Sequence, residues 1–231
     1  MQTTQIRRTI MATGGVACAL VSPFAMAHLG TDLPHSHGEH ALASFMSGAA
    51  HPFTGLDHLA AMVCVGAWSA LGLASSPHGQ VAKQPPRLTA LLAAPAAFAG
   101  TLLLGALLGM AGLTLPGIEP MVAASLLVLG LLVATRLKLP TSLGAALVAV
   151  FALFHGMAHG QELGGHAIAA LSGMVLSTAA LHGLGMGLGL ALRDQGQRPQ
   201  RWLTRLAGAG VALFGVMSGL SLLTPAVAAA I

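Results

Sequence analysis

The sequence predicts an all-α membrane protein, a bundle of six transmembrane helices with a broken first helix after a cleaved N-terminal signal peptide. Hydrophobic residues make up 55% of the chain and charged residues only 7%, whereas a soluble domain carries about 25% charged residues. Apolar segments of about 20 residues, the length that crosses a bilayer as a helix, recur along the sequence. Ionisable residues gather where the first of these segments is interrupted.

Residues 1–27 have the features of a secretory signal peptide. Arg7 and Arg8 precede an apolar stretch, and an Ala-x-Ala cleavage pattern follows at 25–27. Cleavage after this pattern is expected, and an uncleaved first transmembrane helix is the alternative.

A His-rich periplasmic leader, residues 28–40, would then begin the mature chain. This composition favours metal binding, and the alternative is a flexible polar leader without a role. The candidate ligands in the leader are His28, His35, His37 and His40. The remainder, 41–231, is expected to form the six-helix transmembrane domain.

The apolar run at 41–72 is too long for one upright span. Pro52, Thr54 and Gly55 interrupt it within the segment 51–55. We therefore expect a short helix over about 41–50 that dips into or lies on the membrane, followed by a span over about 56–74.

This interruption carries His51, Asp57 and His58. Ionisable groups at membrane depth are costly and mark a pathway or a site, and the ends of broken helices often build ion sites. The alternative for Asp57 is a purely structural role in a capping box, in which Thr54 covers an exposed amide at the start of the next helix.

Five further spans are expected, at about 88–111, 117–135, 141–160, 165–192 and 203–229. The basic residues outside the signal peptide fall in alternate connectors, and they are Lys83, Arg87, Arg136, Lys138, Arg193, Arg198, Arg201 and Arg205. The positive-inside rule places these connectors in the cytoplasm and both mature termini in the periplasm of a bacterial inner membrane. Because the basic residues form no patch, a nucleic-acid partner is not indicated.

Small residues recur at a spacing of four in these spans, as at Gly105 and Gly109 or Gly156 and Gly160. This spacing lets the backbones of two membrane helices approach closely. The same packing role is expected for Gly183, Gly185, Gly187, Gly189, Gly215 and Gly219.

A second set of ionisable residues lies at the end of the span at 141–160. His155 and His159 are four residues apart and share one helix face, and Glu162 follows on nearly the same face. Glu119 opens another span on the same outer side. Three helices therefore bring imidazoles and carboxylates to one level of the membrane, where such ligands suit Ni²⁺, Co²⁺ or Zn²⁺.

His182 lies about sixteen residues into its span, which places it near the inner side. It is either an inner position for the same ion or a buried histidine that bonds a neighbouring helix. His78 and His166 are not expected to be ligands.

At these residues the chain resembles the HupE/UreJ family. The segment His51-Pro-x-x-Gly-x-Asp57-His58 is similar to the first signature of that family. The segment Phe154-His155-Gly-x-Ala-His159-Gly-x-Glu162 is similar to its second signature. The resemblance covers essentially the whole mature chain.

The resemblance implies a nickel or cobalt permease, rather than an enzyme, that serves the maturation of hydrogenase and urease. Residues 41–231 would be its transport domain. The functional positions that the resemblance implies are His51, Asp57, His58, Glu119, His155, His159 and Glu162. Met157 stands where the family often has His.

Two other classes of function use histidines at membrane depth. A membrane cytochrome needs two axial histidines at matched depth and does not account for the carboxylates. An intramembrane metal-dependent hydrolase would use the same ligands around an activated water. No G-x-x-x-x-G-K-[ST] sequence is present, so ATP hydrolysis is not indicated. The expected partners are a divalent metal ion and the lipid bilayer, and a homo-oligomer is left open.

Overall fold

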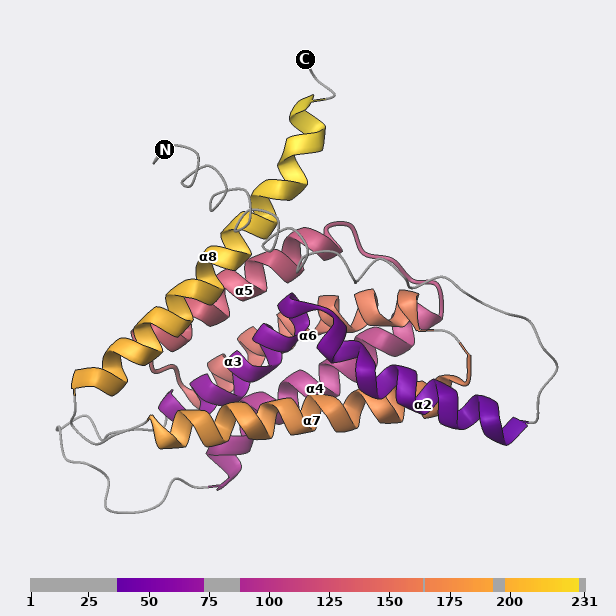
Figure 1. Cartoon of the computed structure of the whole chain (residues 1–231), viewed down its shortest axis with the longest axis horizontal. Helices are drawn as coiled ribbons and strands as arrows, with labels where there is room; N and C mark the ends of the chain where they lie inside the picture. Colours follow the sequence, from indigo (N-terminus) through magenta and orange to yellow (C-terminus); the bar gives the residue numbers. More distant parts are fainter. Residues whose placement is uncertain (1–36, 73–87, 164, 193–197, 229–231) are drawn as a thin grey trace, which may run out of the picture. The chain divides into compact units, whose positions relative to one another are not determined.

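The computed structural model describes residues 37–72, 88–163, 165–192 and 198–228, and within these ranges the chain is helical without a strand. The helices are labelled as in Figure 1: α2 (His37–Thr54), α3 (Leu56–Gly72), α4 (Leu88–Met110), α5 (Ile118–Thr135), α6 (Thr141–Glu162), α7 (Ala167–Ala191) and α8 (Arg198–Ala228). The predicted signal peptide and most of the leader lie outside the described residues.

Among the described residues, five helices are long and apolar enough to cross a membrane. They are α4, α5, α6, α7 and the segment Arg201–Leu223 of α8. Helices α2 and α3 pass the same test together, as one bent span or a re-entrant pair. The bounds of α4 to α7 agree with the expected spans to within a few residues, because the hydropathy of each segment sets its length.

The break in the first span is confined to Gly55. Helix α2 continues to Thr54 with Pro52 inside it, and α3 begins at Leu56. The two helices meet at an angle of 82°. Because Gly55 has no Cβ, the side chains of Asp57 and His58 can lie close to the backbone at this bend.

The expected short helix over 41–50 is therefore wrong at both ends. Helix α2 starts at His37, so the expected boundary between leader and transmembrane domain falls inside a helix. At its other end, Pro52 removes one hydrogen bond in the final turns without ending the helix. The helix ends two residues later, at Thr54.

Helix α7 packs against both halves of the broken helix (Figure 1). A Cβ on Gly173 would lie 2.8 Å from the backbone nitrogen of Ala49 in α2. Farther along α7, a Cβ on Gly185 would lie 3.0 Å from the backbone nitrogen of Ala67 in α3. Glycine at both positions allows the backbone contact that holds helices together in a membrane.

Helices α4 and α6 make a parallel contact of the same kind. A Cβ on Gly105 would lie 3.1 Å from the Cα of Gly156, and one on Gly109 would lie 3.2 Å from the Cα of Gly160. The predicted packing role of these four glycines is confirmed. This contact holds the end of α6 that carries its histidines.

Some of the other glycines contact a neighbouring helix, and others face open space. Gly215 approaches Leu127 while Gly130 approaches Ala212, so α5 and α8 are antiparallel. Gly183 and Gly187 face open space, with no atom within 4 Å of an added Cβ. The predicted packing role of these last two is wrong, because alternate glycines in a run lie on different faces of a helix.

Polar contacts join the helices at the end of the bundle farther from Gly55. The guanidinium of Arg136 donates to the hydroxyl of Thr204 (3.1 Å) and to the carbonyl of Leu192 (3.0 Å). The indole N–H of Trp68 donates to the carbonyl of Leu137 (2.8 Å). These bonds fix the ends of α5, α7 and α8 to one another and to α3.

We predict that Gly105→Ala lowers the stability of the purified protein by about 1–3 kcal/mol, because the added methyl overlaps the backbone of α6. Thermal unfolding in detergent measures this loss. Gly100→Ala, in the same helix but with no atom within 4 Å, is the matched control and should not lower stability. Equal unfolding temperatures for the two variants would contradict the α4–α6 contact.

Candidate metal centre

Four imidazoles from α2, α3 and α6 converge beside the break. The ring centroid of His58 lies 4.2 Å from that of His159 and 5.3 Å from that of His155. The ring of His51 lies 4.7 Å from that of His159. The two groups of ionisable residues in the sequence therefore form one cluster, which we call the outer cluster.

The two histidines of α6 are wholly buried on one face of the helix. Nδ1 of His155 lies 3.0 Å from the carbonyl oxygen of Phe151. Nε2 of His155 and both ring nitrogens of His159 have no hydrogen-bond partner in the described part of the chain. A buried polar atom without a partner costs about 1–3 kcal/mol. A free nitrogen of a neutral imidazole is also what binds a metal ion.

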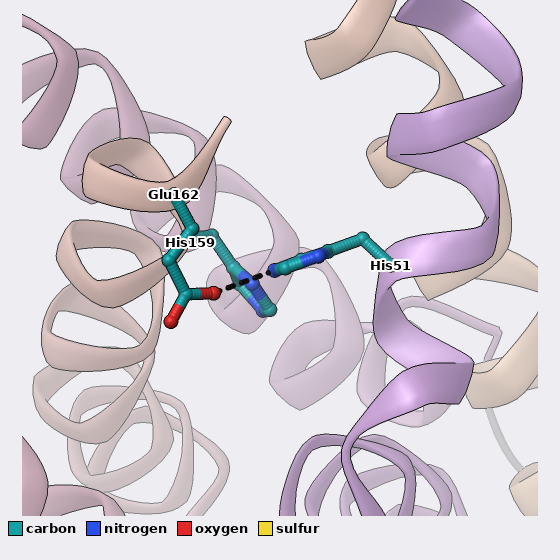
Figure 2. Close-up of side chains that lie close together, drawn as sticks. All are labelled: His51, His159 and Glu162. Atoms are coloured by element: carbon teal, nitrogen blue, oxygen red, sulfur yellow. Dashed lines mark ion pairs between the residues drawn. The ribbon is translucent and has the colours of Figure 1, made fainter. Parts of the chain in front are cut away.

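His51, His159 and Glu162 each offer a ligand atom, and the three atoms lie within 4.8 Å of one another. Nε2 of His51 lies 3.0 Å from Oε2 of Glu162, at ion-pair distance but without the alignment of a hydrogen bond. Figure 2 shows the His159 and Glu162 side chains of α6 facing His51 of α2. Ligands about 2.1 Å from an ion lie about 3–4 Å apart, so small side-chain rotations would bring these atoms around one ion.

The two carboxylate oxygens of Asp57 both lie near His58. Its Oδ1 accepts a hydrogen bond from the backbone N–H of His58 (2.9 Å), and its Oδ2 lies 3.9 Å from Nε2 of that residue. Thr54, expected to cover an amide at the start of α3, instead donates its hydroxyl to the carbonyl of His51 (2.7 Å). The predicted capping box is wrong, because Thr54 belongs to the last turn of α2.

A cavity of about 260 Å³ adjoins the outer cluster between α3, α5, α6 and α8. Its polar lining residues are Asp57, His58, Glu119, Glu162, Ser218 and Ser221. Glu119 thus lines the approach to the cluster and is not one of the three grouped ligands. Three carboxylates around one cavity make it attractive to cations.

The exposed fraction of the side chains falls from Glu162 to the histidines of the outer cluster. The side chain of Glu162 is 60% exposed, that of His51 is 21% exposed and that of His58 is 14% exposed. His159 is fully buried. An ion that enters here would exchange its water for protein ligands step by step.

His182 lies outside the outer cluster. Its ring packs at a right angle on Phe98, with ring centroids 5.2 Å apart, and the residue is 2% exposed. The ring of Phe98 also contacts His155, at 5.8 Å. Because Phe98 is near the middle of α4, His182 is at mid-bundle depth rather than near the inner side as expected.

The leader histidines do not join the cluster within the described residues. His37 and His40 lie at the start of α2, and about eleven residues of helix, or about 16 Å, separate His40 from His51. His28 and His35 fall outside the described part of the chain, as does His78. His166 precedes α7, where its backbone N–H donates to the hydroxyl of Ser44 (2.9 Å).

Three residues around the site were not predicted from the sequence. Ser218 and Ser221 are three apart and share a face of α8, which is a weak signal among apolar residues. Phe98 is an aromatic side chain in an apolar span, and nothing in its local sequence distinguishes it. Its place follows only from the packing of α4 against α6 and α7.

Comparison with known proteins identifies the chain. Residues 16–218 match the family model described as HupE / UreJ protein. A protein named Protein HupE, from Rhizobium leguminosarum bv. viciae, is 39% identical over 187 residues, which cover 79% of this chain and 88% of that protein. No solved structure matches the chain significantly.

We predict that Gly55→Ala weakens nickel binding by the purified protein about tenfold while leaving it folded. An added Cβ would lie 2.6 Å from Oδ1 of Asp57 and 2.8 Å from Cδ2 of His58, so both side chains must move, and a site tolerates shifts of only about 0.5 Å. Equilibrium dialysis with radioactive nickel measures the affinity. Leu56→Ala, at an exposed neighbour, is the control, and an unchanged affinity in Gly55→Ala would contradict this arrangement.

Proposed function

This chain belongs to the HupE/UreJ family, and we propose that it takes up a divalent transition-metal ion, nickel first, across the bacterial inner membrane. It acts as a secondary carrier or facilitator, and the metal supplies the maturation of hydrogenase or urease. The observation that carries the proposal is the outer cluster, in which four imidazoles meet beside carboxylates at a helix break.

The ligand chemistry supports a first-row divalent ion. Such an ion takes about four to six ligands, and neither the break nor α6 offers that number alone. Imidazole nitrogens and carboxylate oxygens suit Ni²⁺, Co²⁺ and Zn²⁺, so cobalt and zinc are the alternative cargo. The carboxylates of Asp57 and Glu162 would offset the charge of the cation as it loses water.

The membrane potential is a sufficient driving force for uptake. A divalent ion that enters down about 100 mV, inside negative, gains about 4.6 kcal/mol. That free energy supports about a thousandfold accumulation. The chain lacks a Walker-type nucleotide-binding sequence, so we assign no ATP-driven step to it.

We propose six spans, with the bent pair α2 and α3 counted as one and both mature termini in the periplasm. Basic connectors then face the cytoplasm, as the positive-inside rule requires. Helix directions support this count, since α4 and α6 are parallel while α5 and α8 are antiparallel. The outer cluster would lie on the periplasmic side, where the metal arrives.

We predict that Asp57→Asn, His155→Ala and His159→Ala each nearly abolish nickel uptake by cells while the protein reaches the membrane in normal amount. The first removes a negative charge and keeps the size of the side chain, and the others each remove one nitrogen. Uptake of radioactive nickel, with cobalt and zinc as competitors, is the measurement.

His166→Ala is the matched control, because this histidine precedes α7 outside the outer cluster. It should transport as the parent chain does. Normal uptake by Asp57→Asn would show that Asp57 has only a structural role, through its contact with the N–H of His58. Normal uptake by both α6 variants would refute a transport role for the cluster.

We predict that a reporter fused after Arg136 or Arg198 reads cytoplasmic and that one fused after Ile231 reads periplasmic. The physical reason is the asymmetry of basic residues between alternate connectors. Paired alkaline phosphatase and green fluorescent protein fusions make the measurement, since each is active on one side only. A cytoplasmic C-terminus would overturn the six-span arrangement.

A further inference from the structure

Helix α7 carries a second pair of buried polar atoms, apart from the outer cluster. Thr178 is fully buried and His182 is 2% exposed. Oγ1 of Thr178 and Nε2 of His182 have no hydrogen-bond partner among the residues that the structure describes. The two residues are four apart, so their side chains share one face of α7.

Among the buried side-chain hydroxyls of the described residues, that of Thr178 is the one without a partner. A hydroxyl inside a helix normally bonds the carbonyl three or four residues earlier. Ser177, its neighbour in α7, does so with the carbonyls of Gly173 (3.2 Å) and Met174 (3.0 Å). The hydroxyls of Thr101, Ser125, Thr135 and Ser172 make the same kind of bond.

The phenyl ring of Phe98 contacts both His182 and the outer cluster. Phe98 is fully buried, with its ring centroid 5.8 Å from that of His155 and 5.2 Å from that of His182. Nε2 of His155 also lacks a partner in the described chain. One apolar ring therefore contacts a histidine with a free ring nitrogen in each of the two groups.

We propose that Thr178 and His182 form a second, inner position for the transported divalent cation, which the ion reaches from His155 past Phe98. This inference rests on the proposed function and deepens it. A hydroxyl oxygen and one imidazole nitrogen are two ligands, with water completing the coordination. Weak coordination suits a position that must release its ion onward, since conduction requires binding at several sites that is weak enough to leave.

The phenyl ring of Phe98 has a separate part in this arrangement. An apolar constriction between two polar positions interrupts a continuous file of water. The ion would pass it only when ligands are available on the far side. The alternative is that His182 is an aromatic packing partner of Phe98 and that the hydroxyl of Thr178 has no role.

Thr178→Val and His182→Leu test this proposal in the full chain reconstituted into liposomes. We expect each to lower the initial rate of nickel(II) uptake at least tenfold, while equilibrium nickel binding at the outer cluster stays within twofold. Thr178→Val replaces an unpaired buried hydroxyl by a methyl group of similar size, so its unfolding temperature should stay equal or rise. Loss of transport without loss of stability is a result that packing alone does not produce.

Ser177→Ala is the matched control, because it removes a hydroxyl that is already bonded within α7, and its uptake should stay within twofold. Wild-type uptake by Thr178→Val and His182→Leu would overturn the proposal of an inner position, provided that His159→Ala does not take up nickel. Wild-type uptake by His159→Ala as well would instead refute the proposed function. Variants that lose uptake, nickel binding and thermal stability together would show a structural role and also overturn the proposal.

Discussion

Close backbone contact between α7 and the two halves of the broken helix is the interaction on which the site depends. The backbone of α2 lies against Gly173, and the backbone of α3 lies against Gly185. A side chain at either position would push the helices apart. In a bilayer no hydrophobic force draws helices together, so such contacts supply the packing energy. They hold the ends of α2 and α3 at 82°, and this angle turns His51 toward α6.

The outer cluster buries unpaired imidazole nitrogens at a free-energy cost that the proposed ion would offset. Nε2 of His155 and both ring nitrogens of His159 lack protein partners in the described chain, and each missing partner costs free energy. The fold tolerates this because glycine contacts between α4 and α6 fix the helix that carries His155 and His159. The two histidines of α6 are fully buried, whereas His51 and Glu162 are partly exposed.

Depth, charge and hydration change together along the proposed route. The carboxylates line the cavity where water has access, and the imidazoles beyond them are progressively buried. Phe98 contacts both His155 of the outer cluster and His182. On the proposed route a cation would meet compensating charge where the side chains are exposed and imidazole ligands where they are buried.

The sequence by itself determined the bounds of α4 to α7 to within a few residues and the two groups of candidate ligands. Hydropathy is a local property, so the expected span at 88–111 matches α4, and a spacing of four places His155 and His159 on one face. Only the tertiary structure decided that His51 faces Glu162 and that His182 packs on Phe98. Those pairings depend on the angle between α2 and α3 and on which glycines contact a neighbouring helix. Both arise from contacts between helices that are far apart in the sequence.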